Sequence, residues 1–409
     1  MKPNSIAIFN SNDEMPKNGD QAFPFRQHSD VLFLSGIDQE QTILVMFPDS
    51  PLPMYREILF LKRTNEHIAV WEGHKYTIDE AKAASGVETV MWIDEFNSVK
   101  PILMHHSEHV YLNTNENDRN SSPVMYRDLR FIHELMEFYP LHDYIRAAPI
   151  ISDIRSVKQD EEIKQMQIAI DITEKAFRRI LKFIKPGVME YEIEAEITHE
   201  FIRNRANGHS YTPIIASGAN ANVLHYIANN CICNSGEVML LDFGAEYANY
   251  AADLTRCVPV SGRFTNRQKQ VYNAVFRVLN EATAMLVAGN TIEEYHKEVG
   301  KIMERELIGL GLLNADEVKK QDPAKPLYKK YFMHGTSHFL GLDVHDIGNR
   351  YKPMRNGNVF TCEPGIYIPE ENLGIRLEND ILLTANGPVN LMKNIPIEAD
   401  EIETLMNNA

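Results

Sequence analysis

The sequence predicts an α/β N-terminal domain followed by a larger α+β domain. In the first third of the 409 residues, short β-rich runs alternate with helical stretches and polar turns, which is typical of an α/β unit. Long helical patterns dominate the rest, with short strands between and after them. The segment 139–157 contains two prolines and no clear period. We therefore expect a linker there, and domains at residues 1–150 and 151–409.

The elements of the N-terminal domain follow from runs of apolar and β-branched residues bounded by polar turn residues. The stretches that lack this β-rich character and follow the fourth and sixth runs suit helices. In chain order, we expect strands at 5–9, 30–36, 42–47, 57–62, 88–92 and 110–113, with helices at 78–84 and 126–138.

The second domain begins with a helix predicted at 160–184. Its apolar residues, such as Ile163, Met166 and Ile170, are spaced mostly by three and four positions, which marks a core-facing stripe. Pro186 and Gly187 end this pattern. Further helices are expected at 191–205, 266–287 and 292–312, with short strands between and after them.

Composition limits the classes of function. Lys and Arg total 41 and Asp and Glu total 57, so the formal net charge is −16. Such a surface repels phosphate backbones and anionic lipid headgroups, which argues against a nucleic-acid or membrane partner. No stretch approaches the ~18 apolar residues of a membrane span, and the first residues contain no signal-peptide core. With four cysteines and no disulfide framework, we expect a reduced, cytoplasmic protein.

Two pairs of acidic residues stand out. Asp242 and Asp253 lie in strand-like sequence around a plausible turn, and a turn centred between Tyr247 and Ala248 would set them directly opposite each other. Two carboxylates that close repel unless a proton or a cation lies between them. A β-bulge would alter this register.

Glu363 and Glu378 repeat the arrangement around a turn near 369–372. Acidic residues on strands usually face solvent, which is the plainer interpretation of each of these residues. It is weaker for Asp242 and Glu363, because each follows a run of apolar residues.

Three histidines, His334, His338 and His345, cluster within twelve positions. The spacing of His334 and His338 suits two ligands on one helical turn. Gly335, Thr336 and Ser337 between them are poor helix formers, so an extended backbone fits equally well. His225 lies in a glycine- and asparagine-rich segment that suits a loop at a site rim.

Four carboxylates with one imidazole form an oxygen-rich ligand set, which prefers Mn²⁺, Co²⁺ or Fe²⁺ to a thiol-bound structural zinc. Four negative charges suffice for two divalent ions about 3.5–4 Å apart with a bridging hydroxide. That hydroxide would act as the nucleophile, and the second ion would polarise a carbonyl.

Several blocks in this order resemble the signature segments of metallopeptidases with the pita-bread (creatinase/aminopeptidase-like) fold, and most closely those of the Xaa-Pro aminopeptidase (aminopeptidase P) family. They are DFGAEYANYAADLTR, HGTSHFLGLDVHD, EPGIYI and GIRLEND. GHSYTPIIASGANANVLHY and FRQHSDVLFLSGI also resemble segments of that family, so the likeness covers most of the chain.

The resemblance implies two divalent metal ions, with Mn²⁺ favoured and Co²⁺, Fe²⁺ or Zn²⁺ as alternatives. It assigns the metal ligands to Asp242, Asp253, His338, Glu363 and Glu378. It also assigns proton-handling or substrate roles to His225, His334, His345, Tyr367 and Arg376. Asn379 departs from the family pattern, because an acidic residue usually follows the last ligand, and this could weaken support of that ligand.

The implied activity is hydrolysis of the Xaa-Pro bond at the N-terminus of peptides, with Glu363 as general base and His345 stabilising the oxyanion. The implied assembly is a homo-oligomer, either a dimer or a tetramer. Prolidase, which cleaves only Xaa-Pro dipeptides, shares all five ligands and remains an alternative. A metal-free binding protein of the same fold is less favoured, because every ligand position holds a competent residue.

Overall fold

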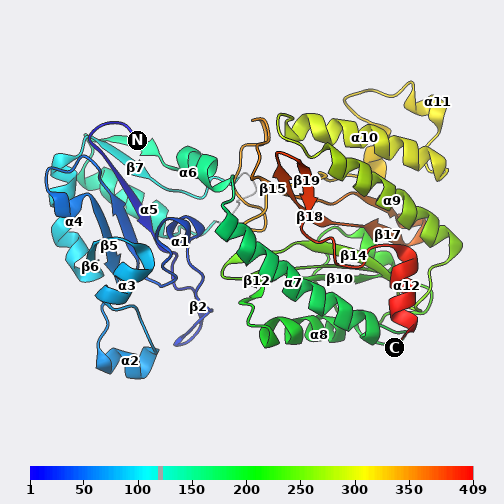
Figure 1. Ribbon diagram of the computed structural model, residues 1–409, viewed down its shortest axis with the longest axis horizontal. Coiled ribbons are helices and arrows are strands. Elements are labelled where there is room, and N and C mark those ends of the chain that lie inside the picture. Colours follow the sequence, from blue (N-terminus) through cyan, green and yellow to red (C-terminus); the bar gives the residue numbers. More distant parts are fainter. Residues whose placement is uncertain (118–122, 409) are drawn as a thin grey trace. The chain divides into compact units, whose positions relative to one another are not determined.

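The chain divides after Arg155 in a computed structural model that describes residues 1–117 and 123–408. The two units are Met1–Arg155 and Ser156–Ala409, and each contains its own hydrophobic core (Figure 1).

The first unit is built on a six-stranded mixed sheet with the order β6-β5-β4-β1-β7-β8. The central strand β1 (Ser5–Asn10) pairs antiparallel with β4 (Ile43–Met46) and parallel with β7 (His109–Leu112). The remaining strands of the sheet are β5 (Glu57–Leu61), β6 (Thr89–Trp92) and β8 (Asp143–Arg146). Its helices include α2 (Glu66–Glu72), α3 (Ile78–Ser85), α4 (Phe96–His106) and α5 (Arg127–Phe138), and a small ribbon comprises β2 (Pro16–Asn18) and β3 (Gln21–Ala22).

One element predicted for this unit is wrong. Residues 30–36, predicted as a strand, form helix α1 (Ser29–Ser35). The ring of His28 accepts a hydrogen bond from the first turn, and Gly36, at φ +69°, closes the last turn in the left-handed conformation. Both caps are local signals that outweigh the β-rich composition.

The boundary between the two units lies within the segment 139–157, where the sequence predicts the linker, but this segment also has regular structure. It contains β8, which pairs parallel with β7, and helix α6 (Ala148–Arg155). The edge strand is short and largely exposed, so it lacks the apolar pattern by which strands are recognised. Helix α4 was also absent from the predicted elements, and it contains Pro101.

The second unit places short sheets between two pairs of helices (Figure 1). Helices α7 (Asp160–Phe183) and α8 (Glu190–Arg203) pack together on one side, and α9 (Asn266–Met285) and α10 (Ile292–Gly309) pack together on the other. These four correspond to the predicted helices, with ends that differ by up to three residues. Shorter helices are α11 (Ala315–Val318) and α12 (Ala399–Asn407).

The strands of this unit fall into four groups. The first comprises β10 (Ile214–Ser217), β11 (Val238–Phe243) and β14 (Leu254–Pro259), and the second β9 (Gly208–His209), β12 (Ala245–Tyr247) and β13 (Tyr250–Ala251). The third comprises β15 (Val359–Cys362), β18 (Asn379–Thr384) and β19 (Gly387–Asn390), and the fourth β16 (Gly365–Ile368) and β17 (Leu373–Arg376).

Among the described residues, none of the helices is long and apolar enough to cross a membrane.

Candidate metal centre

The first acidic pair lies on a hairpin formed by residues 238–259, called here the first hairpin. It runs from β11 through β12 and β13 to β14. Ala248 and Asn249 form its two-residue turn, with φ angles of +48° and +64°. Positive φ at both central positions characterises the tight turn whose twist matches that of the flanking strands. The turn is centred one residue later than predicted.

The predicted opposition of the two aspartates is therefore wrong. Asp242 lies opposite Thr255, so Asp253 is displaced by two positions along the partner strand. Because side chains alternate between the faces of a strand, a shift by two leaves both aspartates on the same face, as diagonal neighbours.

The hydroxyl of Tyr211 brings these two carboxylates together. It lies 2.6 Å from Oδ1 of Asp242 and 2.6 Å from Oδ1 of Asp253. Tyr211 precedes β10, the strand that pairs with β11 and sets Ile214 opposite Asp242. The aspartates thus converge although their registers differ from those predicted.

The second acidic pair lies on residues 359–384, called here the second hairpin, in the predicted register. Cys362 pairs with Asn379 on one side of the acidic residues, and Gly365 pairs with Arg376 on the other. Both pairs belong to one continuous alignment in which Glu363 and Glu378 stand opposite each other. This register prediction is confirmed.

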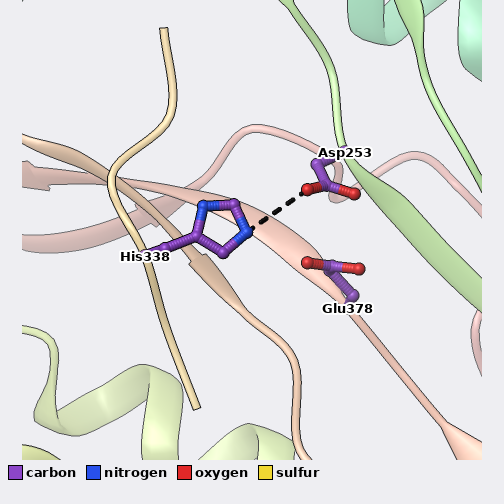
Figure 2. Close-up of side chains that lie close together, drawn as sticks. All are labelled: Asp253, His338 and Glu378. Carbon is purple, nitrogen blue, oxygen red and sulfur yellow. Dashed lines mark ion pairs between the residues drawn. The ribbon is translucent and has the colours of Figure 1, made fainter. Parts of the chain in front are cut away.

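His338 joins the two hairpins (Figure 2). Its Nε2 lies 3.4 Å from Oδ2 of Asp253 and 3.8 Å from Oε1 of Glu363. Its Nδ1 lies 2.9 Å from the carbonyl oxygen of Phe339, which can hold a proton on Nδ1 and leave Nε2 available as a ligand atom. Asp253, His338 and Glu378 offer ligand atoms that all lie within 4.8 Å of one another.

The backbone around the clustered histidines is extended or irregular, so His334 and His338 do not share a helical turn. His338 instead exchanges two hydrogen bonds with Thr361 of β15. The ring of His345 stacks edge-on against that of His338, with centroids 4.4 Å apart. Of the two backbone geometries left open by the sequence, the structure contains the looped one.

Three further predicted residues form a hydrogen-bonded chain beside the carboxylates. Arg376 donates through Nη1 to the hydroxyl of Tyr367 at 2.8 Å, and that hydroxyl lies 2.8 Å from Nε2 of His334. Arg376 also donates through Nη2 to Asp242 at 2.5 Å. Burial, followed by the charge of Arg376, lowers the pKa of His334 to about 3, so this ring is neutral.

His225 is exposed and lies on a loop. Its charge is one of the smaller causes that lower the pKa of His334. The other nine predicted residues therefore belong to one neighbourhood, and His225 is linked to it through its effect on the pKa of His334.

The acidic groups lie in an environment that disfavours their charge. Burial is the largest cause that raises the pKa of Glu363 to about 7 and that of Glu378 well above its usual range. Burial also raises the pKa of Asp242, although Arg376 opposes this effect. Buried like charges at such distances need protons or cations. The oxygen-rich donors, together with the Nε2 atom of His338 among them, fit divalent cations.

Sequence reasoning missed three supporting residues: Tyr211, Thr255 and Asp380. The hydroxyl of Thr255 donates to Oε2 of Glu378 at 2.6 Å, and buried Asp380 accepts from the backbone N–H of Asp253 at 3.3 Å. Tyr211 and Thr255 carried no signal, because their roles depend on cross-strand and loop contacts. Asp380 could have been found, because it sits two positions after Glu378, on the same strand face.

Asn379, the departure from the family pattern, contacts a buried arginine and does not contact Glu378 through its side chain. Its Oδ1 accepts from Nη2 of Arg256 at 2.8 Å. Arg256 also donates to the backbone carbonyl of Glu378, so the amide still fixes the guanidinium behind that carboxylate.

Comparison with known proteins decides the family. Residues 164–385 match metallopeptidase family M24, and residues 1–111 match the aminopeptidase P N-terminal domain. The chain belongs to metallopeptidase family M24. It is therefore related to peptidases, which are hydrolases, and the M24 family implies divalent metal ions.

This M24 chain resembles its relatives over its full length. It is 32% identical to the Xaa-Pro aminopeptidase of Haemophilus influenzae over 100% of this chain and 94% of that protein. It is 33% identical to the Xaa-Pro aminopeptidase of Escherichia coli over 99% and 94%, respectively. A putative aminopeptidase P from Bacillus anthracis matches its structure with a TM-score of 0.92, 32% identity and coverage of 100% and 95%. These matches confirm the predicted family resemblance, the α/β N-terminal domain and the pita-bread catalytic domain.

Proposed function

We propose that the protein is a dinuclear-metal aminopeptidase that hydrolyses the Xaa-Pro bond at the N-terminus of peptides. The observation that carries the proposal is the convergence of two acidic pairs and one imidazole from two hairpins. Similarity to Xaa-Pro aminopeptidases over essentially the whole chain supports the choice of substrate. Proline-containing peptides are accordingly the proposed substrates.

The proposed ligands are Asp242, Asp253, His338, Glu363 and Glu378. Two divalent cations held there would lower the pKa of a water molecule and polarise the scissile carbonyl. We propose Mn²⁺ as the favoured ion because the donors are mostly carboxylate oxygens, with Co²⁺, Fe²⁺ and Zn²⁺ as alternatives.

The remaining chemistry falls to side chains of this chain. An Xaa-Pro bond is a tertiary amide without an N–H, so its recognition depends on pocket shape and on groups that contact the carbonyl. In the proposed reaction, Glu363 accepts the proton of the attacking water, and His345 donates a hydrogen bond to the developing oxyanion. The proton then passes to the proline nitrogen as the C–N bond breaks.

His334, Tyr367 and Arg376 would form a rigid wall for the peptide. Their hydrogen-bonded chain fixes all three side chains before the substrate arrives, which reduces the ordering cost of binding. We assign His225, on the exposed loop, to the outer side of the peptide and to proton handling.

A peptide panel tests the proposal. Xaa-Pro dipeptides, Xaa-Pro-Yaa tripeptides and longer Xaa-Pro peptides are each incubated with the purified protein, first with chelator and then with Mn²⁺, Co²⁺ or Zn²⁺ restored. The proposal expects metal-dependent cleavage of the tripeptide and the longer peptide. Cleavage restricted to dipeptides would establish prolidase activity instead. Metal analysis that finds no bound ion, with no cleavage of any peptide, would indicate a non-catalytic binding protein.

We further propose a homo-oligomer, either a dimer or a tetramer. Sedimentation of the purified chain measures this directly, and a monomer at micromolar concentration would contradict it.

A further inference from the structure

Glu190, the first residue of α8, holds a fully buried carboxylate outside the set of proposed metal ligands. Five donors reach it, all from one loop, residues 217–231. On Oε1 they are the backbone N–H of Ser217 at 2.8 Å, the Ser217 hydroxyl at 2.9 Å and Nδ2 of Asn220 at 3.1 Å. On Oε2 they are the Tyr226 hydroxyl at 2.7 Å and the backbone N–H of Cys231 at 2.9 Å.

The loop needs such an anchor because it is irregular. After a short 3₁₀ turn at Gly218–Asn222, residues 227–230 have no regular structure. The 3₁₀ turn packs closely on β17 of the second hairpin, where a Cβ on Gly374 would lie 2.3 Å from the carbonyl oxygen of Ala221. Glu190 contacts both ends of the loop, and His225 lies between the contact points.

Only a carboxylate suits this position. All five partners are neutral donors, and an ionised carboxylate is purely an acceptor with about four lone-pair sites. A glutamine would keep one acceptor oxygen, and its NH₂ group would oppose the donors on the other side. Charge-assisted hydrogen bonds offset the cost of burying the charge, and losing them leaves several loop groups without partners.

We propose that Glu190 is a positioning residue of the reaction: it holds loop 217–231 in the shape that presents His225 to the peptide. The inference rests on the proposed function, because it assigns Glu190 an effect on catalysis that passes through His225.

The test is a double-mutant cycle on cleavage of an Xaa-Pro-Yaa peptide with Mn²⁺ supplied. The variants are Glu190→Gln, His225→Ala and the double variant. Glu192→Gln is the matched control, because Glu192 lies on the same helix turn but is exposed and caps only the backbone N–H of Met189. Glu190→Gln should lower kcat/KM roughly 10- to 100-fold, since it disrupts a charge-assisted cluster. The control should keep wild-type activity.

The decisive readout is non-additivity. If Glu190 acts through His225, the double variant is no slower than the slower single variant. Multiplication of the two single effects would mean that Glu190 stabilises the fold independently of His225, and this would overturn the inference. Unchanged kcat/KM in Glu190→Gln would also overturn it.

Tyr226→Phe provides a milder variant should Glu190→Gln fail to fold, because it removes one donor at 2.7 Å. It should lower kcat/KM several-fold in the wild-type background and have no further effect in His225→Ala. Hydrogen exchange should rise within 217–231 and stay unchanged in α9. If the wild-type protein cleaves no proline peptide, the proposed function itself fails. If the wild-type protein is active but the effects of the variants multiply, only the inference on Glu190 fails.

Discussion

The two hairpins of the second unit deliver the same chemical groups by different means. Each contributes two carboxylates, yet in the second hairpin the acidic residues face each other directly, whereas in the first they are diagonal neighbours. The difference originates at the turns. The second hairpin reverses through a longer connection with Pro369 and the left-handed Asn372, and the first reverses through Ala248 and Asn249 alone.

This contrast teaches that the face of a strand is a more robust prediction than the register. An error of one residue at a turn centre moves the cross-strand partner by two positions, which preserves the face. The first hairpin still places both aspartates at the site, because they share one strand face and the Tyr211 hydroxyl contacts both carboxylates.

The largest expected effect comes from a comparison of Glu363, at the site end of the second hairpin, with Glu370 at its turn. Glu363→Gln should lower kcat between ~10²- and ~10⁴-fold without loss of folding, because it removes the proposed general base. Glu370→Gln, an exposed residue at the turn of the same hairpin, is the control and should have no effect. Steady-state kinetics with circular dichroism measures both, and retained activity in Glu363→Gln would exclude the assigned role.

Substitution of the glycine two positions after the first acidic residue of each hairpin should have different effects in the two hairpins. A Cβ on Gly244 would lie 1.7 Å from the backbone oxygen of Ala252, so Gly244→Ala should cost about 3 kcal/mol of unfolding free energy. A Cβ on Gly365 would instead meet the hydroxyl of Tyr367 at 2.8 Å. Gly365→Ala should therefore lower activity more than stability. Urea unfolding and enzyme kinetics on both variants measure these effects. A larger loss of stability in Gly365→Ala than in Gly244→Ala would contradict the prediction.

Metal linkage offers a third comparison. Excess metal at about 100 times its Kd stabilises a protein by about 2.7 kcal/mol, and Glu378→Gln should remove most of the resulting rise in Tm. In the metal-free protein, burial raises the pKa of Glu378 and so disfavours its charged form, and the amide replacement should therefore change Tm much less than it does with metal present. Calorimetry with chelator and with Mn²⁺ checks both statements. A full metal-induced rise in the variant would remove Glu378 from the ligand set.

The smallest effect concerns the turns themselves. Ala248, at φ +48°, is strained in a conformation that glycine adopts freely, so Ala248→Gly should stabilise the protein by about 0.5–1 kcal/mol. Asn372, at φ +50°, tolerates this conformation better, and Asn372→Gly should change stability little. Chemical denaturation of both variants measures the difference. Equal stabilisation would show that residue identity at the turn does not distinguish the hairpins.

Much of the fold was predictable where long patterns exist. The 24-residue helix α7 and its three long neighbours were recognisable from apolar spacing, because a helix that packs on a core repeats its buried face every turn. Helix α1 was misassigned because its caps, the His28 ring that accepts from the backbone and the left-handed Gly36, are local contacts that composition does not reveal. The edge strand β8 was missed because few of its side chains are buried.

By itself, the sequence predicted the candidate site residues: the acidic pairs fall on strand-like segments around turns, with apolar neighbours, and the histidines lie close to one another in the chain. The tertiary structure alone decided the first hairpin's register, the choice of loop over helix around His338, and the hydrogen bonds that Tyr211, Thr255 and Glu190 make. The physical reason is that hydrogen bonds between distant segments depend on where strands and loops meet in space, and no local pattern encodes that distance.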